Sequence, residues 1–322
     1  MRNRTSAFLL LICIAASTTF AQQQAIVPAQ PWADTDGVPI NAHGGGVILQ
    51  KGKYYWFGEK RGRSASEGVS VYSSKDLVSW NNEGLALALR DNPNSDITKG
   101  AIIERPKVIY NPKTKKYVMW FHLELKGQGY KAARAGVAVS DAITGPFQFI
   151  ESFRPNDNMS RDMTLFVDDD GSAYHLYSSN ENYDLRVAKL TDDFLRPTTQ
   201  DSLLFSKHRE APAIFKVGKQ YYLITSACTG WAPNKASLHK ANSIFGPWEY
   251  AGDPLHGPLA EITYGGQSTF VLPITQNKFV FMADKWNPQD LKNSTYIWLP
   301  LQVNAEGEVA VHWKEKWSPA DL

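Results

Sequence analysis

An aromatic-rich strand signal recurs five times along the chain and constrains its fold more than any other feature. The five segments are 54–57, 117–121, 174–177, 221–224 and 279–282, at intervals of roughly 47 to 63 residues. A second strand-like segment follows each of them, at 69–72, 135–139, 185–188, 236–239 and 296–299. Repeats of this length with two or more linked strands are typical of propeller blades. The sequence therefore predicts an all-β fold, a five-bladed β-propeller.

Turn-forming residues stand directly before each aromatic segment and support this assignment. They lie at 51–53, 111–114, 168–171, 217–219 and 276–278, and their composition is typical of hairpin turns. Residues 141–147 and 241–248 share a Gly-Pro-aromatic pattern, which marks equivalent places in two repeats. Helical periodicity is not sustained beyond a turn or two. We therefore expect a low helix content.

The first 21 residues have the features of an export signal. Two arginines precede the apolar run 8–16, and small residues lead up to Ala21. The run is too short for a permanent membrane helix, and no later stretch is apolar enough to span a bilayer. We expect cleavage before Gln22, a single mature propeller domain at 22–322, and export to a periplasm or to the extracellular space.

Charge and composition narrow the classes of partner. The formal net charge is +2 and the charges are spread evenly, without the basic stripe that follows a phosphate backbone, so nucleic acid is not an expected partner. Ten tryptophans and 14 tyrosines suit sugar rings, although most of them are expected to pack between strands.

Because Cys13 lies in the export segment, Cys228 has no disulfide partner, and stability must come from the core. A monomer is expected.

Three acidic residues recur at one place in successive repeats. Glu104 and Glu210 each precede a proline and an apolar strand, and Asp162 has the equivalent place in the repeat between them; each acid adjoins an arginine. In equivalent blades the three carboxylates would face one axial funnel. Clustered carboxylates raise one another's pKa and can keep one protonated for donation to a leaving oxygen, as glycoside hydrolysis requires. The alternative is three independent ion pairs with the adjacent arginines.

The corresponding places in the two remaining repeats carry no acid. The fifth repeat offers Gln267, whose amide is not an ordinary base, and the first offers Asn41 and His43 before three glycines. Those glycines lack the spacing of a dinucleotide- or phosphate-binding loop. The Asp-Asp-Asp-Gly run at 168–171 lacks the rest of a calcium loop, so no metal ligands are predicted. Cys228 is expected to be buried rather than nucleophilic.

Six segments together make the chain resemble glycoside hydrolase family 43, and within it the exo-β-1,3-galactanase branch. They are 41–46, 104–111, 160–171, 209–212, 228–234 and 265–270. The resemblance covers almost the whole chain after the export segment. It implies an inverting, exo-acting hydrolase that releases galactose from the β-1,3-galactan backbones of arabinogalactan. It implies no required cofactor, and it is compatible with a structural calcium ion.

The resemblance also implies roles for individual residues. Glu210 would be the general acid, with Asp162 orienting it and tuning its pKa. Most members of the family have an aspartate base in the first blade, and this branch lacks it. Gln267 would therefore position the attacking water, either as an amide or as an imidic acid. Glu104 would hold the sugar or relay the proton. Inversion requires roughly 6.5 to 9.5 Å between the acid and the water-holding group. The residues expected to bind the sugar are Glu59, Arg105, Tyr130, Asn182, Thr229 and Trp231.

Other functions remain open at this point. An α-L-arabinofuranosidase, a β-xylosidase or a galactofuranosidase would share the family chemistry, but the missing first-blade aspartate argues against all three. A non-catalytic glycan-binding propeller would explain why a conventional base is missing. The presence of both Glu210 and Asp162 argues instead for turnover.

Overall fold

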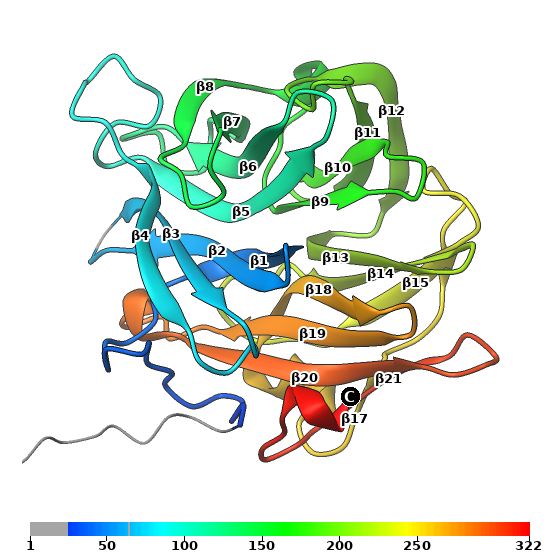
Figure 1. The fold of residues 1–322 in the computed structure, drawn as a ribbon. Helices are drawn as coiled ribbons and strands as arrows, with labels where there is room; N and C mark the ends of the chain where they lie inside the picture. Colours follow the sequence, from blue (N-terminus) through cyan, green and yellow to red (C-terminus); the bar gives the residue numbers. More distant parts are fainter. Residues whose placement is uncertain (1–24, 64) are drawn as a thin grey trace, which may run out of the picture.

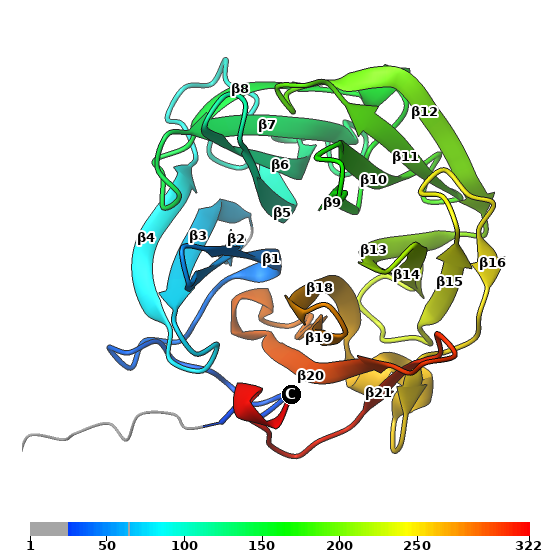
Figure 2. The same cartoon turned by 45° about the vertical axis from the view of Figure 1, so that its right-hand side comes forward.

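Five β-sheets are arranged around a central axis, with the innermost strands β1, β5, β9, β13 and β18 surrounding it (Figure 2). The computed structural model describes residues 25–63 and 65–322 (Figure 1), so the predicted export segment lies outside the described residues. Within the described part, helix is limited to short 3₁₀ segments. The predicted five-bladed β-propeller and low helix content are therefore confirmed.

In the first four blades the strands follow the chain from the axis outward. The first blade contains β1 (His43–Gln50), β2 (Lys53–Arg61), β3 (Ser66–Ser74) and β4 (Asn81–Ala88), and the second contains β5 (Ile102–Asn111), β6 (Lys116–Glu124), β7 (Arg134–Ser140) and β8 (Gln148–Phe153). The third contains β9 (Met163–Val167), β10 (Ala173–Ser179), β11 (Asp184–Leu190) and β12 (Pro197–Ser206), and the fourth contains β13 (Arg209–Val217), β14 (Gln220–Ala227), β15 (Ser237–Ala241) and β16 (Glu249–Tyr250).

The fifth blade gains an extra outer strand. It contains β18 (Gln267–Thr275), β19 (Lys278–Lys285), β20 (Thr295–Val303) and β21 (Val309–His312), and the short β17 (Leu255–His256) pairs in parallel with β21. The 3₁₀ segments are η1 (Pro155–Asp157), η2 (Ala260–Gly265), η3 (Leu291–Asn293) and η4 (Pro319–Asp321).

The aromatic segments of the sequence form the second strand of each blade, not the first. They lie in β2, β6, β10, β14 and β19, and each predicted turn connects one of them to the innermost strand before it. The second strands are buried on both faces by adjoining blades; in β6 every residue after the first is buried. Strands of this kind give continuous apolar runs, which is why their signal dominates the sequence. The innermost strands are weaker signals because they carry polar residues toward the axis.

Bulges interrupt the innermost strands at the repeated acid-x-proline pattern. The pairing register shifts directly after Glu104 in β5 and after Glu210 in β13. The next residues, Arg105 and Ala211, have φ values of 53° and 54°, and Gly44 has 59° at the equivalent bulge of β1. A left-handed backbone costs a residue with a side chain of the order of 1–3 kcal/mol and is found where a bulge turns a side chain out of the regular alternation. The pattern therefore encodes a change of side-chain direction at the axis.

An aromatic cluster fills the junction where the first and fifth blades meet. Trp56 is 1% exposed, and its ring centroid lies 4.7 Å from that of Tyr296, 4.8 Å from Trp298 and 5.4 Å from Trp80. Beside this cluster the two ends of the described chain pair with each other, because Ile26 N donates to Trp317 O at 2.7 Å. The ring of blades is thus closed by aromatic packing and by a short bridge between its ends.

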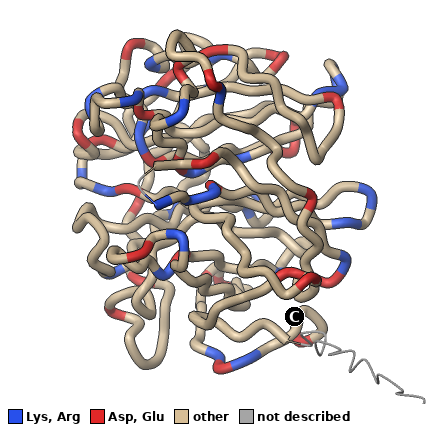
Figure 3. The backbone as a smooth tube through the Cα atoms, turned by 90° about the vertical axis from the view of Figure 1, so that its left-hand side faces the viewer, with Lys and Arg blue, Asp and Glu red and all other residues tan. Residues whose placement is uncertain are grey.

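The surface carries charges of both signs. Lys and Arg alternate with Asp and Glu along the loops and strands seen in Figure 3. Nowhere in residues 25–63 and 65–322 is there a helix with the length and apolar character needed to cross a membrane. These findings agree with the absence of a basic stripe in the sequence.

Truncation of the aromatic cluster should destabilise the whole ring. We expect Trp56→Ala to lower the free energy of unfolding by about 3–5 kcal/mol, because the lost ring leaves a cavity between two blades. Urea denaturation followed by circular dichroism measures the change. Leu203→Ala, at a side chain that is 48% exposed, is the control and should change stability by no more than about 0.5 kcal/mol. Equal losses in the two variants would contradict this account of ring closure.

Candidate active site

A cavity of about 310 Å³ opens at the axis, and every blade contributes to its lining. Its volume is at the lower end of the range of small-molecule sites, about 300–1,000 Å³. The four residues predicted to share one funnel, Glu104, Asp162, Glu210 and Gln267, all line it. The remaining lining residues are Gly44, Glu59, Arg61, Arg105, His122, Tyr130, Arg161, Asn182, Cys228, Gly230, Trp231 and Trp286.

Glu104 is held by donors from three directions. Its Oε1 accepts hydrogen bonds from Arg61 Nη2 at 2.7 Å and from the Tyr130 hydroxyl at 2.8 Å. Its Oε2 lies 3.1 Å from His122 Nδ1, and His122 is its partner in the β5–β6 pairing. Burial opposes ionisation, but the contact with His122 and the charge of Arg61 outweigh it and hold the pKa of Glu104 well below its usual value. Glu104 is therefore an ionised acceptor, not a proton donor.

Arg105 joins three blades at the bottom of the cavity. Its Nη2 lies 2.9 Å from Asp162 Oδ2, and its Nη1 donates to Ser268 O at 3.0 Å. The same Asp162 oxygen accepts from the backbone N–H of Ala211 at 3.0 Å. The bulge residues Arg105 and Ala211 thus meet at one carboxylate, so the strained backbone serves the geometry of the site.

The alternative of three ion pairs between adjacent residues is wrong. Arg105 binds Asp162 of the next blade and not Glu104, and Arg161 pairs with Glu181 at 2.5 Å. Arg209 donates to Thr225 and to backbone carbonyls rather than to Glu210. Both Glu104 and Arg105 line the cavity, yet Glu104 is bound by Arg61 and Arg105 by Asp162, so pairing follows contacts between blades and not adjacency in the chain.

Glu210 is the carboxyl group whose environment best suits proton donation. Its Oε1 accepts from Gln267 Nε2 at 2.9 Å and its Oε2 accepts from Asn182 Nδ2 at 3.0 Å. Burial, and after it the negative charge of Asp162, raises the pKa of Glu210 to about 7. The expected elevation is therefore present, although burial contributes more than the clustering of carboxylates. A proton on Glu210 is available up to near-neutral pH.

Gln267 is oriented by two groups that can only donate. Its Oε1 accepts from the Arg105 guanidinium and from Trp286 Nε1 at 3.0 Å, so the amide oxygen must face them. Its Nε2 donates to Glu210 and to Ser226 Oγ at 3.1 Å. The separation of roughly 6.5–9.5 Å expected for acid and water-holding group is not found here, because the amide and the carboxyl group hydrogen-bond directly. No water fits between two groups at this distance.

Glu59 is buried and pairs with Arg61, which also binds Glu104. Its Oε2 lies 2.7 Å from Arg61 Nε, and its Oε1 accepts a hydrogen bond from the Ser66 hydroxyl. Burial raises the pKa of Glu59 to about 8, although the charge of Arg61 opposes this shift.

Two tryptophans and an arginine form the aromatic wall of the cavity. The rings of Trp231 and Trp286 meet edge to face with centroids 5.3 Å apart, and the Arg61 guanidinium carbon lies 5.6 Å and 5.8 Å from them. Trp231 is 38% exposed, so part of its ring is open to a ligand. An exposed aromatic face beside hydrogen-bonding groups is suited to a sugar ring.

Most of the residues expected to bind the sugar line the cavity, but Thr229 does not. Its hydroxyl donates to Ala232 O at 2.6 Å and accepts from Asn234 Nδ2 at 2.7 Å, so it shapes its own loop. His43 is fully buried and stacks on Tyr296 with ring centroids 5.2 Å apart. His43 is therefore part of the core and not a ligand.

Three important residues were missed by the sequence analysis: Arg61, His122 and Trp286. Arg61 ends β2, His122 lies in β6, and Trp286 follows β19. Each lies in the last part of an aromatic second strand or directly after it, and those strands were interpreted only as packing elements. The one usable signal was the common position of these polar or exposed residues at the same end of their strands.

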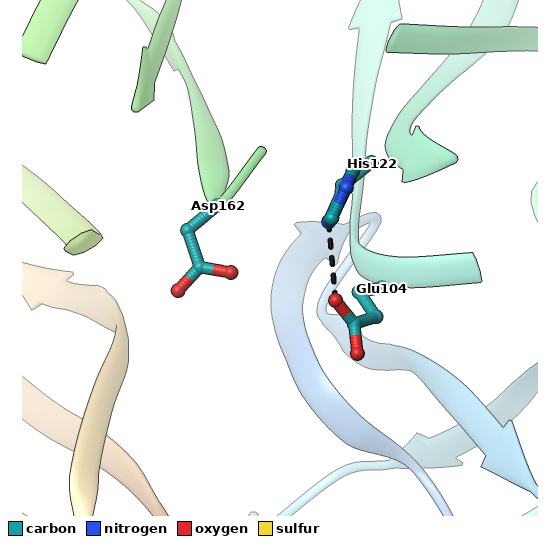
Figure 4. A group of neighbouring side chains, drawn as sticks. All are labelled: Glu104, His122 and Asp162. Atoms are coloured by element: carbon teal, nitrogen blue, oxygen red, sulfur yellow. Dashed lines mark ion pairs between the residues drawn. The ribbon is translucent and has the colours of Figure 1, made fainter. Parts of the chain in front are cut away.

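Glu104, His122 and Asp162 have ligand atoms within 4.8 Å of one another (Figure 4). Calcium requires six or more oxygen ligands, whereas the histidine of this group offers nitrogen. Arg61 and Arg105 already neutralise the two carboxylates at 2.7 Å and 2.9 Å. These residues therefore do not fit the structural calcium ion that the resemblance would allow, and we interpret them as an ion network.

Comparison with known proteins identifies relatives of the chain. The family model described as glycosyl hydrolases family 43 matches residues 42–295. A curated β-xylosidase from Bacillus subtilis (strain 168) is 23% identical over 203 residues. That match covers 58% of this chain and 36% of the relative, so the chain spans only about a third of the curated protein.

Several solved structures are more similar. A family 43 β-1,3-galactosidase, solved with galactodeoxynojirimycin, is 47% identical with a TM-score of 0.89, covering 91% of this chain and 99% of the other. An exo-β-1,3-galactanase from Phanerochaete chrysosporium, solved with galactose, is 36% identical with a TM-score of 0.86 and coverages of 91% and 68%. An exo-β-1,3-galactanase from Clostridium thermocellum is 36% identical with a TM-score of 0.84 and coverages of 91% and 66%.

The thiol of Cys228 should report the charge on Glu210. Burial, followed by the charge and hydrogen bonding of Glu210, raises the thiol pKa well above its usual value, so we expect slow alkylation although Cys228 lines the cavity. At pH 8 iodoacetamide should react at least about tenfold more slowly with the folded protein from residue 22 onward than with the same protein in urea. Glu210→Gln should accelerate the reaction of the folded protein, as measured by mass spectrometry. Equal rates in folded wild type and Glu210→Gln would show that the carboxylate does not act on the thiol.

Proposed function

The chain belongs to glycosyl hydrolase family 43, and we propose that it is an inverting, exo-acting hydrolase that releases galactose from the β-1,3-galactan backbones of arabinogalactan. One observation carries the proposal: a partly buried carboxyl group with a raised pKa, Glu210, shares a cavity with ionised Glu104, with Asp162 and with Gln267. The printed activities of the similar β-1,3-galactosidase and exo-β-1,3-galactanases support the choice of substrate.

In the proposed reaction Glu210 gives its proton to the glycosidic oxygen. The bond between that oxygen and the anomeric carbon breaks, and the bonding electrons remain on the departing oxygen. Glu210 is then a carboxylate, and the amide hydrogen of Asn182 is already directed at its Oε2. Asn182 and the charge of Arg105 stabilise the ionised product form, whereas burial and Asp162 favour the protonated reactant form. The balance keeps the pKa close to neutrality.

Glu104 is proposed to stabilise positive charge on the sugar. The transition state of glycoside hydrolysis resembles an oxocarbenium ion, and a fixed carboxylate lowers its energy. Arg61 and Tyr130 occupy Oε1 of Glu104, whereas Oε2 has only His122 as a donor. A carboxylate oxygen can accept two hydrogen bonds, so Oε2 retains capacity for a sugar hydroxyl. This supports holding the sugar, rather than relaying a proton, as the role of Glu104.

Gln267 is proposed to position the attacking water as an amide. The oxygen of this water bonds to the anomeric carbon, and its surplus proton passes to solvent. An imidic acid would place a hydroxyl on Oε1, where Arg105 and Trp286 both present N–H groups. Since neither group can accept a hydrogen bond, the environment favours the amide form. Entry of a sugar must separate Gln267 from Glu210, and this frees the Nε2 hydrogens for new partners.

The size of the cavity supports exo action. A volume of about 310 Å³, bounded by the aromatic wall, suits a terminal sugar better than a long chain threaded through the site. We further propose that the protein works as a monomer after export through the segment 1–21, and that the reaction needs no redox or nucleotide cofactor. The β-xylosidase alternative is less favoured, since that relative is 23% identical and the galactan-active structures are 36–47% identical.

Replacement of the acid tests the proposed reaction directly. We expect wild-type protein to release galactose from β-1,3-galactan and not from arabinan or xylan. Glu210→Gln should lower kcat by about 10²- to 10⁴-fold, because it removes the proton donor. Proton NMR of the fresh product should show the α-anomer, since inversion changes the configuration of a β-linkage.

The controls separate this function from its rivals. Asp201→Asn, at a buried carboxylate that binds Arg186 in the third blade, should retain wild-type kcat. Binding of galactan without sugar release would support the non-catalytic propeller, and release from xylan or arabinan would support the other activities of the family. A β-anomeric first product would contradict inversion.

The pH dependence should follow the protonation of Glu210. Because its pKa is raised to about 7, the protonated fraction falls as pH rises through 7, and kcat/KM should fall about tenfold per pH unit beyond it. Asp162→Asn removes a negative charge that raises this pKa, so the alkaline limb should move to lower pH in initial-rate measurements. A limb that stays in place in Asp162→Asn would show that Asp162 does not tune Glu210.

A further inference from the structure

A line of buried ionisable groups runs from the cavity into the second blade. His122 Nδ1 lies 3.1 Å from Glu104 Oε2, and His122 Nε2 lies 2.8 Å from Glu124 Oε1. His122 and Glu124 are each 1% exposed, and they occupy alternate positions of β6, on the same face of the strand. Glu124 faces no other side chain of the cavity; both its oxygens accept from the backbone N–H of Ala133, at 3.1 Å and 3.0 Å.

The geometry places a carboxyl group at each ring nitrogen of His122. Nε2 hydrogen-bonds Glu124 at 2.8 Å, whereas Nδ1 and Glu104 form an ion pair at 3.1 Å without hydrogen-bond geometry. A neutral imidazole donates at one nitrogen and accepts at the other, so two ionised neighbours are matched by the doubly protonated imidazolium. Burial alone would lower the pKa of His122, but the contacts with Glu104 and Glu124 reverse this and raise it to about 9.

Other charged groups around the ring act in both directions. Asp162, from the third blade, has an oxygen within 4.8 Å of the Glu104 and His122 ligand atoms, and Figure 4 shows it across the cavity from that pair. Arg61 of β2 reaches the far oxygen of Glu104, and the Tyr130 ring lies 6.0 Å from the imidazole. Glu104 and Glu124 favour the charged ring. Arg61 opposes it by partly neutralising Glu104, and Arg105 neutralises Asp162 at 2.9 Å.

We propose that His122 is a positioning residue that is charged at neutral pH and that Glu124 keeps it charged, so that Glu104 is held ionised and fixed in direction. This inference rests on the proposed function in one respect, namely that Glu104 contacts the sugar. His122 itself acts through Glu104. Without the charge of the imidazolium, Glu104 and Glu124 would both lie buried beside a neutral ring. The cost of removing their negative charges from water would then have no opposite charge on His122 to offset it. Glu104 would then gain a proton or move, and its charge would be lost from the transition state.

A purely structural role for these residues is the competing explanation. Glu124 also anchors the backbone at Ala133, in the loop that carries Tyr130, so its replacement could disturb the cavity mechanically. Such a disturbance would lower activity by a similar factor at every pH. Loss of a charge from His122 would instead lower activity only where the ring has become neutral, and this difference decides between the two explanations.

The first experiment observes the charge itself. Selective ¹⁵N labelling of histidine, with His122→Gln identifying the signal, should show both ring nitrogens of His122 protonated at pH 7, with a midpoint near 9. Glu124→Gln should lower that midpoint by about 1 to 3 pH units, since one opposite charge is removed. A neutral His122 ring at pH 7, or a midpoint that does not move in Glu124→Gln, would overturn the proposal. This measurement needs no substrate, so it remains informative if wild-type protein releases no galactose and the proposed function fails.

The second experiment compares kcat of each variant with that of wild type at the same pH, which cancels the titration of Glu210. For Glu124→Gln we expect a loss of at most about twofold at pH 5.5 and of about tenfold at pH 8, where its His122 is mainly neutral. His122→Gln has no ionisable ring and should lose about tenfold or more at both pH values. A loss in Glu124→Gln that is equal at the two pH values would favour the structural explanation and contradict ours.

Asp201→Asn is the matched control for removing a buried carboxylate. It should lower the melting temperature, because Asp201 binds Arg186 at 2.8 Å, but leave the ratio of kcat to wild type constant with pH. A pH-dependent ratio in this control would show that the signature is not specific to His122. If Glu124→Gln does not fold, the wild-type titration of His122 still tests the proposal.

Discussion

The burial of several carboxyl groups around one cavity is the constraint on which the rest of this structure depends. A buried charge without a partner is too costly to keep, so each must be paired or neutralised by a proton. The structure pairs most of them and leaves one close to neutrality. Arg61 pairs with Glu59 and Glu104, Arg105 pairs with Asp162, and His122 pairs with Glu124. The pKa of Glu210 is raised to about 7, so this group can carry a proton up to near-neutral pH.

This distribution of charge gives the groups different chemistry although they share a side-chain type. Glu104 has a strongly held charge and can stabilise a cation, whereas Glu210 has a pKa near 7 and can donate a proton. The bulges after these residues place them in the cavity at a cost in backbone strain.

The sequence predicted the propeller and the common cavity well, because both depend on repetition. Buried second strands give strong aromatic signals, and residues at equivalent places of a repeat meet at the axis. For that reason the repeat pattern alone places Glu104, Asp162, Glu210 and Gln267 together. The innermost strands themselves gave a weak signal, because their polar residues have little periodic pattern, and the aromatic segments proved to be the second strand of each blade.

By itself the sequence determined which residue types recur at the axis, and hence the fold and the acids of the site. Only the tertiary structure decided which group pairs with which, and therefore which acid is charged. Arg105 lies beside Glu104 in the chain but binds Asp162, and His122 reaches Glu104 from the neighbouring strand. The physical reason is that protonation depends on distances of a few ångströms between blades and on burial. Neither quantity is encoded in the spacing of residues along one strand.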